Sequence, residues 1–167
     1  YIYLCIFIII LLLYIYSYYK YPQNISILQA RPFEFSTNML LEKQPIVIEN
    51  NNSNLDDLKK LYFYLNPTQY FNLTSSDIWH KNIYKYTAIQ FQSNGEILLS
   101  PPNTKMIIDD KSPSQNIIPD PSNTNLLAIQ AKVGEIVILP FHWYYYISNK
   151  LNVKCLGIHD YITYFLP

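Results

Sequence analysis

Three histidines are the side chains of this sequence that could most readily bind a metal ion or move a proton near neutral pH. His80 directly follows Trp79, a setting more typical of a packed or hydrogen-bonded surface histidine than of a metal ligand. His159 is followed by Asp160, and neighbouring side chains on a strand point to opposite faces, so we do not expect these two to share a ligand. His142 stands in an aromatic segment. By themselves, the histidines predict structural roles.

Acidic residues gather in two places. Asp109 and Asp110, with Asp120 further along the same polar stretch, could bind calcium, but carboxylates in a polar loop are usually just solvated. The DDLKK run at residues 56–60 places opposite charges three residues apart, which is typical of a solvated helix face. Neither group predicts a catalytic site.

The two cysteines are not expected to pair. Cys5 lies in an apolar N-terminal segment and Cys155 lies in a predicted strand, so a disulfide between them is not expected. Two cysteines are also too few for a disulfide framework or a zinc knuckle. They favour a reducing compartment only weakly.

Charge and composition exclude some classes of function. The chain of 167 residues has 12 basic and 12 acidic residues, and Arg31 is its single arginine, so no basic nucleic-acid footprint is present. Half of the residues are apolar, which excludes global disorder. Tyr, Ile, Asn and Lys are abundant while glycine occurs three times, a bias typical of a very A/T-rich genome.

The first 19 residues form an uncharged apolar segment in which Ser17 is the one small polar residue. A helix of about 19 residues is roughly 29 Å long, close to the hydrocarbon thickness of a bilayer. Tyrosines gather at both ends, where an amphipathic ring suits the headgroup layer. The apolar run is too long for a signal peptide and has no small-residue cleavage site. We therefore predict a transmembrane anchor over residues 1–19 and a separate domain over residues 20–167.

The basic residues that flank this segment predict its orientation. Lys20 and Arg31 follow it, which favours a cytoplasmic C-terminal domain under the positive-inside rule. The sequence begins with Tyr1 rather than Met, and positive charges preceding Tyr1 would reverse this prediction. Asn-x-Ser/Thr sequons occur at Asn24, Asn51 and Asn72, but an Asn-rich sequence produces such sequons by chance.

Helix and strand patterns beyond the apolar segment predict an α+β fold that is mainly β. The early part predicts a short strand over residues 25–29, a short helix from Ser36 to Lys43, a strand over 45–49, and a helix over 55–65 capped by Asn54. Strands then follow over 85–92, 96–100, 105–109, 126–132, 135–140, 143–147 and 153–158. The proline-containing stretch 110–125 predicts an irregular loop. Short strands after a helical start indicate a β-sandwich or barrel with helices at one end.

Three segments together resemble the cupin-like and JmjC-type double-stranded β-helix family, which includes asparaginyl and lysyl hydroxylases. They are LLEKQPIVI at residues 40–48, IQFQSNGEILLSPP at 89–102 and VGEIVILPFHWYYYI at 133–147. They occur in the order typical of the family and cover roughly residues 25–158. The resemblance implies a cupin-like double-stranded β-helix, or jelly roll, with N-terminal helices, preceded here by a single transmembrane helix.

The resemblance also implies where a metal site would lie. Enzymes of the family bind Fe(II) through a His-x-Asp pair and a later histidine, and a basic residue binds the 2-oxoglutarate carboxylate. The matching positions in this chain are His80, Asn82 and Tyr145, and the basic position falls near Gly95. Because the amide and the phenol replace two of the three ligands, we expect no catalytic residues, no confident metal site and no cofactor.

The predicted function follows from the anchor and the altered site together. We expect a membrane-anchored, non-catalytic binding or structural module with a degenerate metal site, similar to cupin-like membrane proteins of giant DNA viruses, in a virion or viral membrane. Its expected partners are the membrane and proteins at the membrane, not nucleic acid. Alternatives are a divergent Fe(II)/2-oxoglutarate-dependent hydroxylase that keeps His80 as a ligand, and a lectin-like or small-ligand pocket in the barrel mouth.

Overall fold

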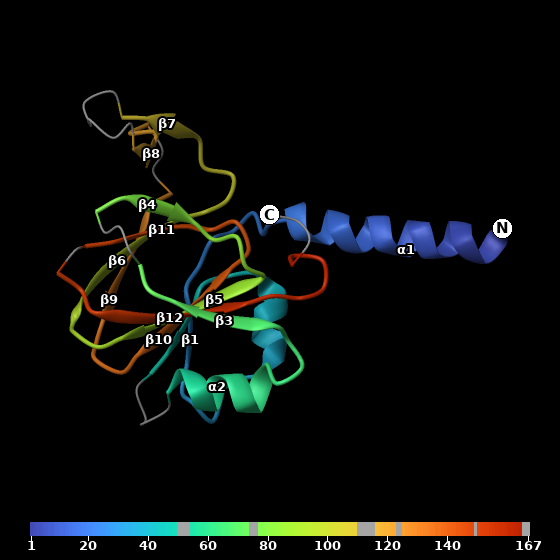
Figure 1. The fold of residues 1–167 in the computed structure, drawn as a ribbon. Helices are drawn as coiled ribbons and strands as arrows, with labels where there is room; N and C mark the ends of the chain where they lie inside the picture. The colour runs from blue at the N-terminus through green and yellow to red at the C-terminus, as the bar shows by residue number, and fades with distance from the viewer. Residues whose placement is uncertain (50–53, 74–76, 110–115, 123–124, 149, 165–167) are drawn as a thin grey trace.

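A long helix projects from a β-rich body (Figure 1). The structure is a computed structural model, and it describes residues 1–49, 54–73, 77–109, 116–122, 125–148 and 150–164. The fold is mainly β with some α+β character, as the sequence predicted. The helices are α1 (Ile2–Tyr19), the 3₁₀ helix η1 (Thr37–Glu42) and α2 (Leu55–Tyr62).

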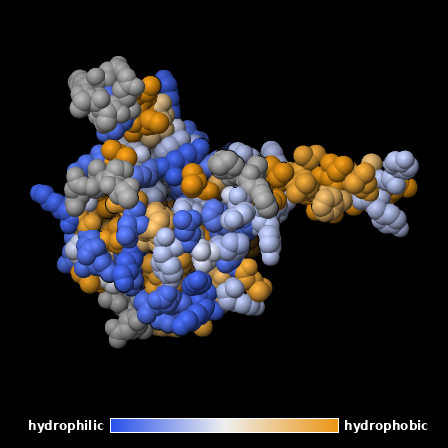
Figure 2. Space-filling model, in the orientation of Figure 1, coloured by the Kyte–Doolittle hydropathy of each residue, from blue (hydrophilic) through white to orange (hydrophobic). Residues whose placement is uncertain are grey.

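Helix α1 is apolar on every side and exposed along nearly all of its length. Its 18 residues give a length of roughly 27 Å, and Tyr18 is its one buried residue. Figure 2 shows this helix as an apolar rod that stands clear of the more polar body. A helix that is hydrophobic all round and has no protein cover is typical of a membrane span. By length and composition, α1 could cross a membrane.

Two sheets make up most of the body. The large sheet has the strand order β1-β2-β10-β5-β12-β3, the small sheet has the order β4-β11-β6-β9, and β7 and β8 form a separate two-stranded hairpin. The β1–β2 pair is parallel and every other pair is antiparallel. The strands are β1 (Leu28–Ala30), β2 (Ile46–Ile48), β3 (Thr68–Phe71), β4 (Trp79–Lys81), β5 (Tyr86–Phe91), β6 (Gly95–Ser100), β7 (Met106–Ile108), β8 (Ile117–Pro119), β9 (Leu127–Ala131), β10 (Ile136–Pro140), β11 (Tyr144–Ile147) and β12 (Val153–Ile158).

The large sheet separates two hydrophobic cores. Along β10, Ile136 and Ile138 pack toward η1 and α2, while Val137 and Leu139 pack between the two sheets. Successive side chains of a strand point to opposite faces, so a strand buried on both faces needs a continuous apolar run such as this one. Trp143, 1% exposed, is among the largest side chains of the core between the sheets.

Two predicted helices differ from the structure in type or length. The predicted helix from Ser36 to Lys43 is the 3₁₀ helix η1, and the Ser36 side chain makes no capping hydrogen bond. The second helix begins where predicted, because the Asn54 side chain accepts a hydrogen bond from the Asp57 amide at 2.9 Å. It ends at Tyr62 rather than Leu65: the backbone of Phe63 leaves the helical conformation, with φ −129°, and its side chain is buried in the core.

Three strands were not predicted. Strands β3 and β4 are short and mostly polar, and they form through pairing with β12 and β11 respectively. Strand β8 lies inside the stretch predicted as an irregular loop and pairs with β7. Strands β3 and β4 depend on distant partners rather than on a local hydrophobic pattern, whereas β8 pairs with the strand directly before it.

Candidate functional site

His80 and Tyr145, two of the three residues that the sequence resemblance predicted at a metal site, meet in the small sheet. They are directly opposite each other where β4 pairs with β11. Their rings stack with centroids 5.4 Å apart. Tyr145 is buried, and burial above all, together with Cys155 and Tyr84, raises the pKa of its phenol. The phenol therefore stays protonated near neutral pH.

Asn82, the third of these positions, is buried and fully hydrogen-bonded within the protein. Its Nδ2 donates to the carbonyls of Leu139 at 3.0 Å and Pro140 at 2.7 Å. Its Oδ1 accepts from the Tyr84 amide at 3.0 Å and from the Thr87 hydroxyl at 2.7 Å. These four bonds use both donors and the acceptor oxygen of the amide, which leaves no lone pair in an open position for a metal ion.

At Gly95, near the position predicted for a basic residue, the space beside the backbone is filled by the Leu151 side chain. Gly95 opens β6, and a Cβ atom placed there would overlap the Leu151 side chain. A lysine or arginine at this position would therefore require Leu151 to move. Among the described residues, no group of three or more His, Cys, Asp or Glu side chains is arranged to hold a metal ion.

The acidic loop has its own internal partners. Asp120 accepts hydrogen bonds from the backbone and side chain of Ser122 and forms an ion pair with Lys105 at 3.5 Å. These hydrogen bonds, chiefly, lower the pKa of Asp120. Asp109 is at the end of β7, and Asp110 lies outside the described residues. Within the described part of the loop, the arrangement is that of a solvated turn.

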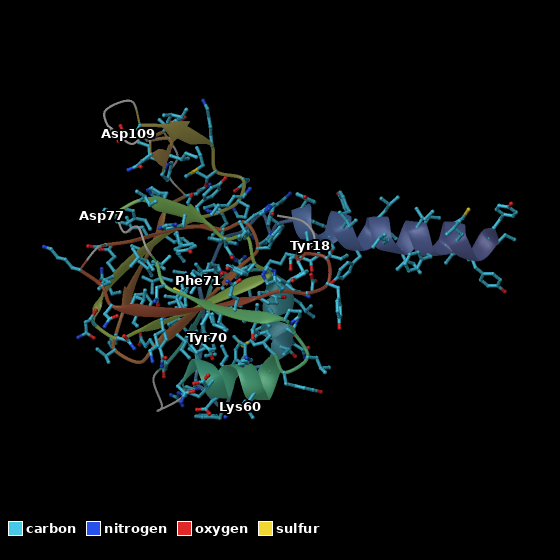
Figure 3. All side chains as sticks on the ribbon, viewed as in Figure 1. Tyr18, Lys60, Tyr70, Phe71, Asp77 and Asp109 are labelled. Atoms are coloured by element: carbon cyan, nitrogen blue, oxygen red, sulfur yellow. The ribbon has the colours of Figure 1, made fainter. Side chains whose placement is uncertain are left out.

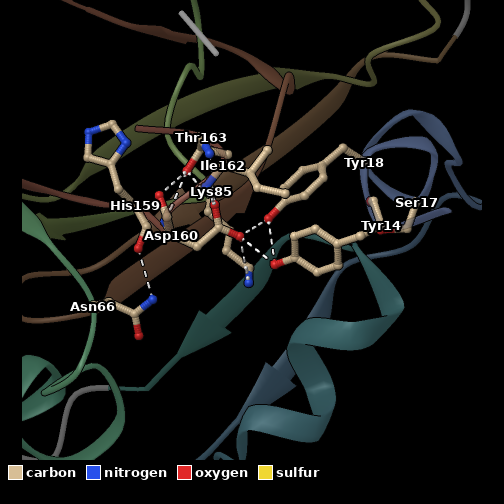
Figure 4. A network of polar contacts seen from close by, with 9 residues as sticks. All are labelled: Tyr14, Ser17, Tyr18, Asn66, Lys85, His159, Asp160, Ile162 and Thr163. Carbon is tan, nitrogen blue, oxygen red and sulfur yellow. Dashed lines mark hydrogen bonds and ion pairs between the residues drawn. The ribbon is translucent and has the colours of Figure 1, made fainter. Parts of the chain in front are cut away.

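Polar side chains are instead concentrated where the end of α1 meets the body (Figure 4). Asp160, 8% exposed, lies just after β12. Its Oδ2 accepts hydrogen bonds from the hydroxyls of Tyr14, at 2.6 Å, and Tyr18. Lys85 forms an ion pair with the same oxygen at 3.2 Å. One buried carboxylate thus connects the last turns of α1 to the start of β5.

The other carboxylate oxygen of Asp160 holds its own turn in shape. Oδ1 accepts from the amides of Ile162 at 3.0 Å and Thr163 at 2.8 Å, and from the Thr163 hydroxyl at 3.0 Å. A short acidic side chain that bonds amides two and three residues later is a standard turn device. Oδ1 therefore stabilises the turn after β12, and Oδ2 binds the end of α1.

Lys43 caps the C-terminal end of α1. Its backbone is left-handed, with φ 54°, at the end of η1. Its ammonium donates to the carbonyls of Ser17 and, at 2.7 Å, Lys20. The last carbonyls of a helix have no partner within the helix and carry partial negative charge, so a lysine stabilises them. Burial, with a smaller contribution from Lys20, lowers the pKa of Lys43.

Aromatic rings complete the contact between α1 and the turn after β10. The Tyr18 ring packs edge-on against Phe141 at 5.4 Å. The Tyr19 ring packs against His142 at 5.8 Å, and the Tyr21 hydroxyl is 3.1 Å from Nδ1 of His142. His142 has φ 65°, an unusual conformation for a residue with a side chain. Burial, together with Lys81, lowers its pKa to about 4.

A cavity of about 160 Å³ opens at this junction. Its walls come from α1, from η1, from the start of β5 and from the turn after β10. The residues that line it are Tyr14, Ser17, Tyr18, Tyr21, Leu40, Leu41, Lys43, Lys85, Tyr86, Pro140 and Phe141.

This junction was not predicted from the sequence. Asp160 was considered there only as a neighbour of His159, and no role was expected for Lys43 or Lys85. The D-x-x-T pattern from Asp160 to Thr163 indicates a turn, but nothing in the sequence connects it to Tyr14, which lies 146 residues away. The structure pairs His80 with Tyr145 across β4 and β11, and it gives Asn82 a structural role.

Comparisons of this chain with protein-family models, with curated proteins and with solved structures find no match.

Proposed function

We propose that this chain is a membrane-anchored, cupin-like module that acts by binding or scaffolding at a membrane rather than by metal-dependent oxidation. The proposal rests on the properties of α1. This helix is uncharged, apolar and exposed, and hydrogen bonds from Tyr14 and Tyr18 to Asp160 fix its C-terminal end to the body. Such a helix without protein cover needs lipid around it. Its fixed end would hold the body at the membrane surface.

The strand order supports the jelly-roll part of the proposal. Going along the chain, β3, β4, β5 and β6 pair antiparallel with β12, β11, β10 and β9, in that order. The pairs are nested, like one long hairpin, and alternate between the large and the small sheet. Folding a long hairpin over in this way is the plan of the eight-stranded jelly roll, an architecture that cupins share with viral capsid and lectin domains.

The chemistry of the matching positions supports a non-catalytic role. A 2-His-1-carboxylate iron site needs a carboxylate where this chain has Asn82, and that amide is already occupied by four protein hydrogen bonds. The second histidine position holds Tyr145, a buried phenol with a raised pKa. The residues present therefore do not fit Fe(II). A place in a viral membrane is a further part of the proposal, supported by the apolar anchor, the A/T-rich composition and the altered metal site together.

The test uses the full chain expressed with a C-terminal tag. We expect it to sediment with membranes and to remain in the pellet after alkaline carbonate treatment, which strips peripheral proteins. After detergent purification, anaerobic incubation with Fe(II) and desalting, we expect iron at the level of a no-protein control. Release by carbonate would contradict the anchor, and one iron per chain would contradict the non-catalytic role and revive the hydroxylase alternative.

A further inference from the structure

The cavity at the junction combines positive charge with an apolar wall. The ammonium groups of Lys43 and Lys85 border it, and Leu40, Leu41 and Phe141 supply apolar surface. At about 160 Å³ it exceeds the space of several water molecules, which occupy about 30 Å³ each. It can therefore accept a small charged group with an apolar attachment.

The charges at the junction do not balance. Lys85 is paired with Asp160, whereas Lys43 contacts two backbone carbonyls and the face of the Tyr21 ring, and no ion pair of Lys43 is found among the described residues. Lys20 follows directly at the end of α1 and adds a third cation. Burial lowers the pKa of both Lys43 and Lys85, so each ammonium is partly removed from water. An anion in the cavity would offset that desolvation.

The position of the cavity selects a lipid as the source of the anion. Tyr14 and Tyr18 on the last turns of α1 form part of the wall, and Lys20 is the first charged residue after the helix. If α1 crosses the bilayer, these tyrosines and the lysine lie at headgroup depth, where lipid phosphates are present at high concentration. The exposed Leu41 side chain, 76% accessible, stands at the same end of the body, where it can contact a lipid glycerol or acyl chain.

We propose that this cavity binds the phosphate headgroup of an anionic phospholipid, with the Lys43 ammonium as its principal contact. The inference rests on the proposed membrane anchoring and adds a ligand to it. Lys43 has three donors, of which two already point to the carbonyls of Ser17 and Lys20, so its third can reach a phosphate oxygen. Such a lipid would fill the space between the helix and the body and strengthen their contact.

The test measures thermal unfolding of the full chain in neutral maltoside micelles. The added probes are dihexanoyl-phosphatidylglycerol, dihexanoyl-phosphatidylcholine and inorganic phosphate at equal concentrations. We expect phosphatidylglycerol to raise Tm by about 3–6 °C at saturation, and the other two probes to leave it unchanged. Equal Tm shifts with phosphatidylglycerol and phosphatidylcholine would overturn the proposal. If inorganic phosphate raises Tm as much as phosphatidylglycerol does, the lipid assignment is overturned and the ligand is a free anion.

Variants test whether the rise in Tm comes from phosphatidylglycerol bound in the cavity. Lys43→Gln should abolish the phosphatidylglycerol shift, whereas Lys43→Arg should retain it. Lys60→Gln is the matched control, because Lys60 is an exposed lysine on α2, far from Tyr18 (Figure 3). Leu41→Glu covers the case that Lys43→Gln does not fold, since Leu41 is exposed and a carboxylate there should repel the headgroup and reduce the shift. A full shift in Lys43→Gln or in Leu41→Glu would overturn the assignment.

Failure of this inference differs from failure of the proposed function. A chain that resists carbonate extraction but shows no preference for phosphatidylglycerol would keep its anchor and lose the lipid site. A chain that carbonate releases would lose both.

Discussion

At the scale of single residues, the side-chain nitrogen of Asn82 distinguishes a structural hydrogen-bonding site from an iron site, which would need a carboxylate oxygen there. An aspartate in its place would restore the carboxylate of an iron site, but it would point an anion at the carbonyl oxygens of Leu139 and Pro140. The amide offers two N–H donors there, and the protein uses both. The backbone at the end of β10 therefore requires an amide at position 82.

We expect Asn82→Asp to lower the free energy of unfolding by about 3 kcal/mol, because a buried charged acceptor would replace two donors. For a chain of this size, that corresponds to a fall in Tm of about 6–12 °C, measurable by circular dichroism. Asn103→Asp, at an exposed turn residue, is the control and should stay within about 0.5 kcal/mol of wild type. An unchanged Tm together with bound iron in Asn82→Asp would contradict the structural role.

His142 makes stability depend on pH. Its pKa in the folded chain is about 4, below its ordinary value of 6.5. As pH falls below about 6.5, the unfolded chain binds a proton at His142 that the folded chain does not, so this residue lowers stability progressively down to about pH 4. We expect Tm to fall more between pH 7 and pH 5 in wild type than in His142→Asn.

Asparagine is the suitable replacement for His142, because it tolerates the left-handed backbone at φ 65° and does not titrate. The carboxylates that also titrate in this range are the same in both proteins, so the difference in Tm between them isolates His142. The same loss of Tm in both proteins would show that His142 titrates normally in the folded chain.

At the scale of elements, one oxygen of Asp160 joins α1 to the body, beside the Lys43 cap and the aromatic contacts. Asp160→Asn keeps Oδ1, which accepts from the amides of Ile162 and Thr163, but replaces Oδ2 by a donor. Tyr14 then loses its acceptor and Lys85 loses its counter-charge. We expect Asp160→Asn to lower the free energy of unfolding by about 2 kcal/mol. This is less than the loss for breaking a fully buried ion pair, because Lys85 is partly exposed.

Hydrogen–deuterium exchange in micelles can separate the two oxygens of Asp160. In Asp160→Asn, the amides of the last turn of α1 should exchange faster, while those of Ile162 and Thr163 should remain protected. In Asp160→Ala, both sets should exchange faster, and in Tyr14→Phe/Tyr18→Phe only the helix end should change. Unchanged exchange at the helix end in all three variants would show that the polar contacts do not hold α1 against the body.

At the scale of the whole molecule, α1 should decide where the protein is found. The variant Ile9→Arg/Leu12→Arg places two charges in the middle of the helix, each unfavourable by about 2.5–3.5 kcal/mol at that depth. We expect most of the chain to move to the carbonate-soluble fraction. The matched control, Leu61→Arg/Leu65→Arg, changes two exposed apolar residues at or just beyond the end of α2 and should leave the protein in the pellet.

The sequons can report the orientation of the body. Asn24 and Asn72 are exposed, and Asn51 lies outside the described residues. When the chain is translated with microsomes, we expect no glycan at Asn72, because the positive-inside rule predicts that the body stays on the cytoplasmic side. A glycosylation tag added before Tyr1 should be modified in the same experiment. The opposite pattern, with a mass shift that Asn72→Gln removes, would place the body in the lumen.

The sequence by itself determined the elements whose signals are local. An uncharged run of 18 residues became α1, the Asn54 cap opened α2, and the continuous apolar run of β10 became a strand buried on both faces. These signals lie within a few turns or one strand of chain.

Only the tertiary structure decided which distant groups meet. The short strands β3 and β4 exist because partners elsewhere in the chain complete their hydrogen bonds. Asn82 finds its acceptors 57 and 58 residues later, and Asp160 finds Tyr14 146 residues earlier. A polar side chain gives no local sign of which distant backbone or carboxylate it will meet. The junction between helix and body therefore became visible only once the sheets had brought these groups together.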